Sequence, residues 1–173
     1  MTLIKALEAD RQGQIEKAAI EYESALANDA DDLVSTMNLM VLYWQSTDYG
    51  FSLAHQLLQP FIANAGTRLA ELLKTAKQRF TERPEVRFWS KYIAWADLGD
   101  SFDPDECRAL LDRYPDYLEP AMLLFSLSQG VEAEDIANDL LIRCRADNTT
   151  RSRYVISVIE GVLKRKNARK QAR

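Results

Sequence analysis

The residue types that could carry catalysis are few in this sequence. His55 is the only histidine, so a Ser-His-Asp or Cys-His site would have to include it. It lies in a helical segment between apolar neighbours, Leu53 and Leu57, which favours a structural or surface histidine over a catalytic one. The chain also has no Gly-rich phosphate loop and no serine in a Gly-x-Ser-x-Gly turn. We therefore expect no enzymatic activity.

Metal-binding patterns are equally weak. Cys107 and Cys144 are separated by 37 positions, without a CxxC pair or a second ligand cluster, so they indicate neither a zinc site nor a disulfide framework. The acidic residues between Asp97 and Glu106 offer oxygen ligands but lack the spacing of a calcium loop. Helix caps and solvated helix faces explain the same residues. We predict no metal and no cofactor.

A basic segment over residues 164–173 has six positive charges and no acid. Two interpretations are open: a solvated helix end whose cations complement the helix dipole, or a contact for nucleic acid or an acidic partner. We favour the solvated end, because residues 1–140 carry 24 acidic and 12 basic side chains and would repel a nucleic acid. The candidate contact residues are Lys164, Arg165, Lys166, Arg169 and Lys170.

The composition describes the protein that must position these residues. The chain has 173 residues, 47% of them hydrophobic and 28% charged, with only 6 Gly and 5 Pro, which indicates a globular helical domain rather than a disordered or turn-rich one. The N-terminus lacks the pattern of a secretory signal, and no apolar run reaches the roughly 18 residues of a membrane span. We expect a cytoplasmic protein that does not enter the membrane.

Helical periodicity dominates the first half of the chain. It predicts a short helix that ends at Gly13, a second helix from Ile15 to about residue 28, and a third from about residue 34 to 45 that Asp31 or Asp32 caps. A further helix should run from about residue 49 to 59. We expect Pro60 to kink or end it.

The second half continues the same pattern with clearer start signals. Thr67 is expected to cap a helix at residues 67–82, and Pro84 to open an aromatic helix that closes at Gly99. Asp103 should cap the next helix, with Glu106 reaching back to the amide of the cap. Three more apolar stripes, over residues 118–125, 136–141 and 154–163, bring the total to about ten antiparallel helices with short connections.

Residues 13–32 resemble the second half of a tetratricopeptide repeat (TPR). That family uses a glycine between its two helices, small residues at set points of the second helix and an aromatic residue four positions after the first of them. Gly13, Ala18, Tyr22 and Ala25 match in spacing, and the next turn follows after the 34 residues typical of the family. The resemblance is clearest over residues 1–50 and partial over 84–115.

The resemblance implies an all-α fold in which antiparallel helix pairs stack as a short right-handed solenoid, a single domain over residues 1–163 followed by the basic tail at 164–173. It further implies a concave groove lined by the first helix of each pair. The positions that it places in this groove are Val34, Met37, Asn38, Val41, Trp44 and Gln45, with Val86, Trp89, Ser90 and Ile93 further along the chain. Of these, the candidates for partner binding are Met37, Asn38, Val41, Trp44, Gln45 and Trp89. For Trp44 and Trp89, packing in the core is an equally open interpretation, whereas Tyr92 and Trp95 are expected in the core.

These observations favour an adaptor or partner-specific chaperone that binds a peptide or helix of another protein. The alternative is a nucleic-acid-associated regulatory factor that uses the basic segment. Contact between the basic end of one copy and the acidic body of the next, giving a homo-oligomer, is a further interpretation of the same charges.

Overall fold

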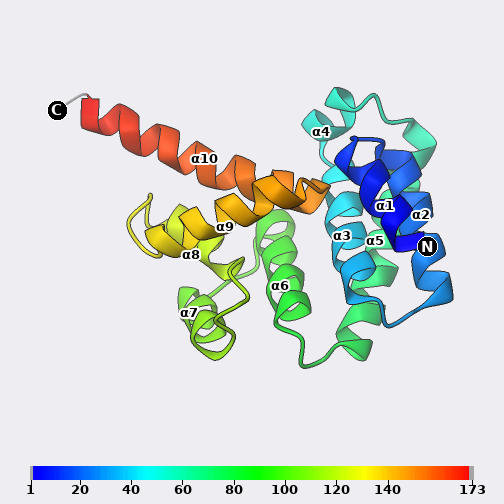
Figure 1. Ribbon diagram of the computed structural model, residues 1–173, viewed down its shortest axis with the longest axis horizontal. Coiled ribbons are helices and arrows are strands. Elements are labelled where there is room, and N and C mark those ends of the chain that lie inside the picture. The colour runs from blue at the N-terminus through cyan, green and yellow to red at the C-terminus, as the bar shows by residue number, and fades with distance from the viewer. Residues whose placement is uncertain (1, 172–173) are drawn as a thin grey trace. The chain divides into compact units, whose positions relative to one another are not determined.

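The computed structural model describes residues 2–171, which form ten helices and no strand (Figure 1). The all-α fold predicted from the periodicity is confirmed, and several pairs of consecutive helices pack against each other. The helices are α1 (Thr2–Arg11), α2 (Ile15–Asn28), α3 (Leu33–Ser46), α4 (Tyr49–Ala54), α5 (Gln59–Arg79), α6 (Pro84–Leu98), α7 (Pro104–Arg113), α8 (Pro120–Leu127), α9 (Glu134–Asp147) and α10 (Thr150–Gln171).

These helices form two compact units. The first contains residues 2–86 and 149–151, and the second contains residues 87–148 and 152–171. Helices α6 and α10 therefore begin in the first unit and continue in the second. Within residues 2–171, none of the helices combines the length and the apolar character that crossing a bilayer requires.

In the first unit, α1 and α2 form an antiparallel hairpin, and α3 packs against both α2 and α5. Gly13 joins α1 to α2 with φ of +72°, a conformation that costs glycine little and other residues more. Asp32 caps α3, because its carboxylate accepts a hydrogen bond from the Ser35 amide at 3.0 Å. Ala18 and Tyr22 of α2 are fully buried, as the spacing of small and aromatic residues suggests.

A buried carboxylate ties α1 to the start of α10 within the first unit. Asp10 is 0% exposed, and its Oδ1 accepts hydrogen bonds from the Thr150 amide at 2.7 Å and from the Thr150 hydroxyl at 2.6 Å. Its Oδ2 accepts one from the Tyr22 hydroxyl at 3.0 Å. Asp10 thus satisfies an amide in the first turn of a helix that lies 140 positions away in the sequence.

The helix boundaries between residues 49 and 80 differ from the prediction. Helix α4 ends already at Ala54, and the chain turns through Gln56, which adopts φ of +53°. Pro60 was expected to kink or end the helix predicted over residues 49–59. It lies instead in the first turn of α5, where a proline gives up no intrahelical hydrogen bond. Thr67 lies inside α5 and caps nothing, because α5 runs without interruption from Gln59 to Arg79.

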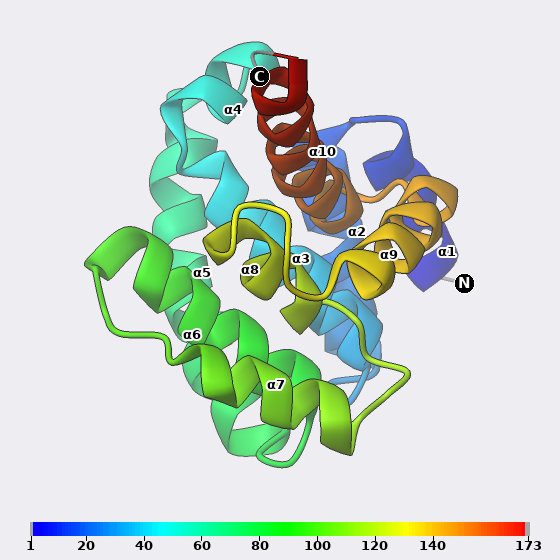
Figure 2. The same cartoon turned by 90° about the vertical axis from the view of Figure 1, so that its left-hand side faces the viewer.

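In the second unit, α8 packs against both α7 and α9 (Figure 2). Asp103 caps α7 as predicted, with its carboxylate accepting the Asp105 amide at 2.9 Å. The carboxylate of Glu106, however, forms an ion pair with Lys91 of α6, so the predicted reach back to the cap is not part of the structure. Lys91 offers this carboxylate a full positive charge, which attracts it more strongly than a backbone amide.

Candidate functional site

The partner-binding positions predicted on α3 lie in the interior of the protein. Four of them are at most 6% exposed, namely Met37, Asn38, Val41 and Trp44. Gln45 is half-buried. Helix α3 is apolar over most of its circumference, which is the pattern of a helix buried on most sides. The face that the resemblance assigns to a partner is therefore an interior face in this structure.

Trp89 of α6 also belongs to the core, in this case of the second unit. Its side chain is 0% exposed, and its indole N–H donates a hydrogen bond to the Glu119 carboxylate at 2.6 Å. The ring lies edge-on to Tyr92 and Tyr154, with centroids 5.4 Å and 6.1 Å away. For Trp44 and Trp89, both partner binding and core packing were open interpretations. The structure supports core packing for both residues. Tyr92, expected in the core, is 4% exposed.

The first unit has an accessible groove elsewhere, between α2 and α5. Its volume is about 350 Å³, and α3 forms its floor through a stripe of three residues, Thr36, Leu39 and Tyr43. Its walls carry small and apolar side chains for most of their length. These are Leu26, Ala27 and Ala30 from α2 and the residues after it, and Leu72, Thr75, Ala76 and Phe80 from α5 and its end.

A polar network lies toward one end of the groove. Arg68 of α5 donates a hydrogen bond to the Glu23 carboxylate of α2 at 2.8 Å, and the same oxygen accepts the Tyr43 hydroxyl at 2.5 Å. A second carboxylate, Glu71, pairs with the other side of the same guanidinium at 2.9 Å. Burial raises the pKa of the Tyr43 hydroxyl, and the hydrogen bond to Glu23 raises it further. The phenol therefore stays protonated and acts as a donor.

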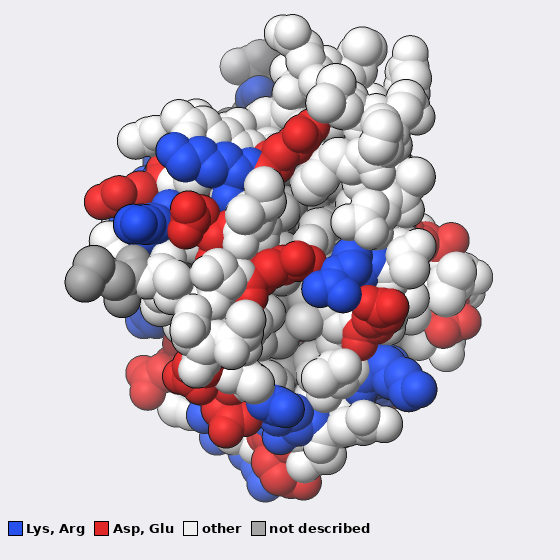
Figure 3. All heavy atoms as spheres, turned by 90° about the vertical axis from the view of Figure 1, so that its right-hand side faces the viewer, with Lys and Arg blue, Asp and Glu red and all other residues white. Residues whose placement is uncertain are grey.

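Toward the other end of the groove, Arg79 forms an ion pair with Asp31 at 3.2 Å. Arg68 and Arg79 lie eleven positions apart on α5, which corresponds to about 16 Å along a helix. Figure 3 shows the face of the molecule on the right-hand side of Figure 1, where charged side chains of both signs border a hollowed, uncharged area. The groove thus has an apolar interior and internally paired charges at both ends.

His55 is half-buried next to the turn between α1 and α2. Its ring packs on Phe51 with centroids 4.3 Å apart, and a Cβ added at Gly13 would lie 3.9 Å from its Cε1. The hydroxyl of Ser52 is directed to the carbonyl of Tyr49 at 3.1 Å rather than to the imidazole. This environment packs the histidine against the fold.

The cysteines and the acidic segment have structural roles in the second unit. Both thiols are buried, and burial, together with the negative charge of Glu106, raises the pKa of Cys107 to about 12. Asp105 pairs with Arg108, and its neighbours cap α7 or bind a lysine, as described above. Among residues 2–171, no group of three His, Cys, Asp or Glu side chains could hold a metal ion.

The predicted basic segment continues α10 as a helix to Gln171, whereas positions 172 and 173 lie outside the described residues. Lys164, Arg165, Arg169 and Lys170 are exposed. Lys166 is half-buried and pairs with Glu134 of α9 at 2.6 Å, which lowers the pKa of that carboxyl group. The candidate electrostatic residues therefore lie together on the last turns of one helix.

The groove-lining residues were not among the sequence-based candidates. Part of the signal was present: Leu69, Leu72, Ala76 and Phe80 form one apolar stripe of a single helix. A stripe does not tell whether another helix or an open groove faces it, and here Leu69 is buried while Leu72 and Phe80 line the groove.

Comparisons with models of known protein families, with curated proteins and with solved structures find no match to this chain.

Proposed function

We propose that this protein is an adaptor or partner-specific chaperone that binds an amphipathic helix of another protein in the groove between α2 and α5. The observation that carries the proposal is the groove itself, which has an apolar interior of about 350 Å³ and is open to solvent on a small helical protein. Clefts of this size and lining are typical of sites that bury apolar groups of a ligand.

The groove geometry favours side chains that enter from one face of a partner helix. The ion pairs of Arg68 and Arg79 lie toward the two ends of the groove, so the apolar lining between them has a limited length. The distance of about 16 Å between them corresponds to three turns of helix, enough for anchors at positions i, i+3 or i+4, and i+7. Leu39 and Leu72 then provide the apolar contacts on the floor and the wall.

Charge contributes little to this binding mode. Glu23 and Asp31 are already paired with the two arginines across the groove, and such exposed pairs contribute little stability. The partner helix should therefore be recognised mainly by its apolar stripe, and its affinity should change little with salt.

The resemblance of residues 13–32 to a TPR unit supports the same class of function. Gly13, Ala18, Tyr22 and Ala25 match that family in spacing, and its members bind peptides or helices in grooves between stacked helices. The proposed groove uses α2 and α5 as walls rather than the first-helix face expected from the family.

A library of displayed peptides of about 16 residues tests the proposal directly. Peptides selected on the wild-type protein should carry an apolar stripe of helical period, and the variant Ala27→Glu/Thr75→Glu should bind them about tenfold more weakly or worse. Both positions are exposed and line the groove, so the carboxylates enter it without disturbing the core.

The matched control is Ala70→Glu/Gln78→Glu, which adds the same charge at exposed positions of α5 outside the groove lining. It should retain the affinity of the wild type within about twofold. Equal losses in both variants, or a selection that yields no amphipathic peptide, would overturn the groove assignment.

A further inference from the structure

The second unit has a pocket of about 240 Å³ between the segment that ends α8 and the last turns of α10. Ser126 and Gln129 line it on one side, and Val162, Arg165 and Arg169 of α10 line it on the other. Two guanidinium groups thus border one small pocket from positions i and i+4 of a helix, where side chains lie on the same face.

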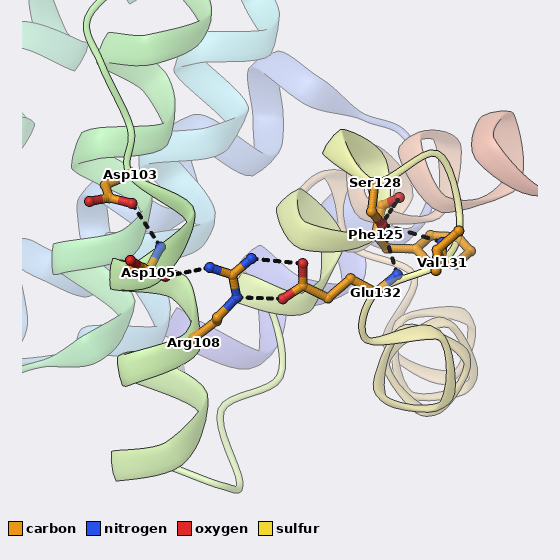
Figure 4. A network of polar contacts seen from close by, with 7 residues as sticks. All are labelled: Asp103, Asp105, Arg108, Phe125, Ser128, Val131 and Glu132. Carbon is orange, nitrogen blue, oxygen red and sulfur yellow. Dashed lines mark hydrogen bonds and ion pairs between the residues drawn. The ribbon is translucent and has the colours of Figure 1, made fainter.

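The segment that carries Gln129 is held by a dense set of contacts (Figure 4). The Ser128 hydroxyl oxygen accepts the amides of Val131 at 3.3 Å and Glu132 at 2.8 Å. The Glu132 carboxylate in turn accepts two hydrogen bonds from one edge of the Arg108 guanidinium, from Nε at 2.6 Å and from Nη2 at 2.9 Å. Such bidentate pairs fix orientation, so the wall of the pocket is tied to α7.

The same segment is fixed to α10. Gly130 adopts φ of +90°, and its carbonyl accepts a hydrogen bond from the Lys166 ammonium at 2.7 Å. A Cβ at this position would lie 3.0 Å from Lys166 Cδ and 3.2 Å from Val162 Cγ1, so glycine permits the close approach. Arg169 donates a hydrogen bond to the side-chain oxygen of Gln129 across the pocket, which leaves the amide nitrogen of Gln129 as a donor.

The positive charge of the pocket is not neutralised by its surroundings. Two acids of α9 and α10 form ion pairs with cations that do not line the pocket, because Glu134 pairs with Lys166 at 2.6 Å and Glu160 pairs with Arg145 at 2.8 Å. Among the contacts of residues 2–171, Arg165 and Arg169 have no carboxylate partner. Salt screens charges over about 8 Å, so these local cations outweigh the more distant acidic residues.

We infer that this pocket binds a phosphate of a nucleic-acid backbone. The arginines offer forked N–H donors suited to phosphate oxygens, and the Ser126 hydroxyl and the Gln129 amide add two neutral donors. Of the described residues that line the pocket, none is aromatic, so none offers a ring on which a base could stack. Binding is therefore directed to the backbone and is independent of base sequence.

The flanking charges favour a polyanion over a single phosphate. Lys164 and Lys170 are exposed on either side of the two arginines, and they lie about 9 Å apart along the helix axis. No acid occurs from residue 161 to residue 171. The helix end can thus contact a second phosphate beside the one in the pocket, which a phosphorylated side chain would not provide.

The test uses the full chain and a fluorescein-labelled single-stranded oligothymidylate of 20 nucleotides, with anisotropy measured over a series of salt concentrations. The variant Arg165→Gln/Arg169→Gln should bind about tenfold more weakly or worse at low salt. Its slope of log K against log salt should be smaller in magnitude by about 1.4, the value for two lost contacts to a single strand. Inorganic phosphate should compete with the wild type for the oligonucleotide.

The control is Lys164→Gln/Lys170→Gln, which removes the same charge outside the pocket and should cost markedly less affinity. All four positions are exposed, so circular dichroism and the unfolding temperature should match those of the wild type. Equal losses in the two double variants would overturn the pocket and leave only diffuse attraction. A wild type that binds a phosphoserine peptide but not the oligonucleotide would overturn the nucleic-acid assignment.

Discussion

In the groove of the first unit, both arginines are paired with carboxylates across the opening, whereas in the pocket of the second unit neither arginine has a carboxylate partner among residues 2–171. The groove has an apolar floor that belongs to the core, since Leu39 is 2% exposed. The two arginines of the pocket are exposed side chains at the end of α10. The groove thus offers a partner apolar burial, whereas the pocket offers a partner positive charge.

The two sites differ in how far they can be mutated without loss of folding free energy. A groove whose floor is core cannot be altered deeply without loss of folding free energy, so its function is best tested at its exposed rim. The pocket can lose both arginines while the helix that carries them stays folded. Salt should also distinguish the sites, because it weakens phosphate contacts and has little effect on apolar burial.

The largest expected effect is on the first unit, through Asp10→Ala. The change removes the carboxylate that accepts hydrogen bonds from the Tyr22 hydroxyl and from the Thr150 amide and hydroxyl. These three donors are buried, so no other acceptor replaces the carboxylate without cost. We expect the free energy of unfolding in urea to fall by about 3 kcal/mol. Glu8→Ala, at an exposed position of α1, is the control and should unfold like the wild type. Superimposable curves for the two variants would contradict the role of Asp10.

A smaller effect, confined to alkaline pH, is expected from the aromatic core of the second unit. The Tyr92 and Tyr154 hydroxyls are 2.8 Å apart, and burial raises the pKa of both. The folded state therefore holds protons that the unfolded chain releases near pH 10. Stability is complete below that pH and should decline above it, by up to about 1.4 kcal/mol per pH unit for each group.

Tyr92→Phe should make this alkaline decline shallower, as measured by urea unfolding at a series of pH values. Tyr49→Phe removes an exposed phenol from the first unit and should leave the slope as in the wild type. A wild type whose stability does not change between pH 9 and 11 would exclude this account of the tyrosine pair.

The comparison also shows which parts of the molecule the sequence can predict. Several residues that act on their own neighbours were predicted accurately, because Gly13 in the first turn, Asp32 as a cap and Asp103 as a cap follow from local chemistry. Thr67 and Glu106 were not, because the length of α5 and the Lys91 ion pair decide their roles. Pro60 was misassigned because a proline is compatible with both the end of one helix and the first turn of the next. The turn at Gln56 has no glycine to mark its positive φ.

The candidate sites depended on contacts far apart in sequence, and the prediction was weaker there. Met37 and Val41 were chosen for their helical spacing, but α3 is apolar on most of its surface, so periodicity could not separate an exposed face from a buried one. For the pocket, the charge run identified Arg165 and Arg169. Their position opposite Gln129 follows from packing between helices, which the sequence alone does not encode in a readable pattern.

The smallest expected effect separates the two sites most clearly, through Arg108→Gln. Arg108 and Glu132 lie on the surface, so the loss of the ion pair between them should leave the unfolding midpoint unchanged. The variant frees Glu132 from α7, and hydrogen exchange at the Val131 and Glu132 amides should accelerate while exchange in α3 stays as in the wild type. Because Gln129 belongs to the same segment, affinity for the oligonucleotide should fall modestly, whereas peptide binding in the groove should not change. If the two amides exchange at the wild-type rate, the Ser128 contacts hold the segment without help from the ion pair, and α7 has no part in shaping the pocket.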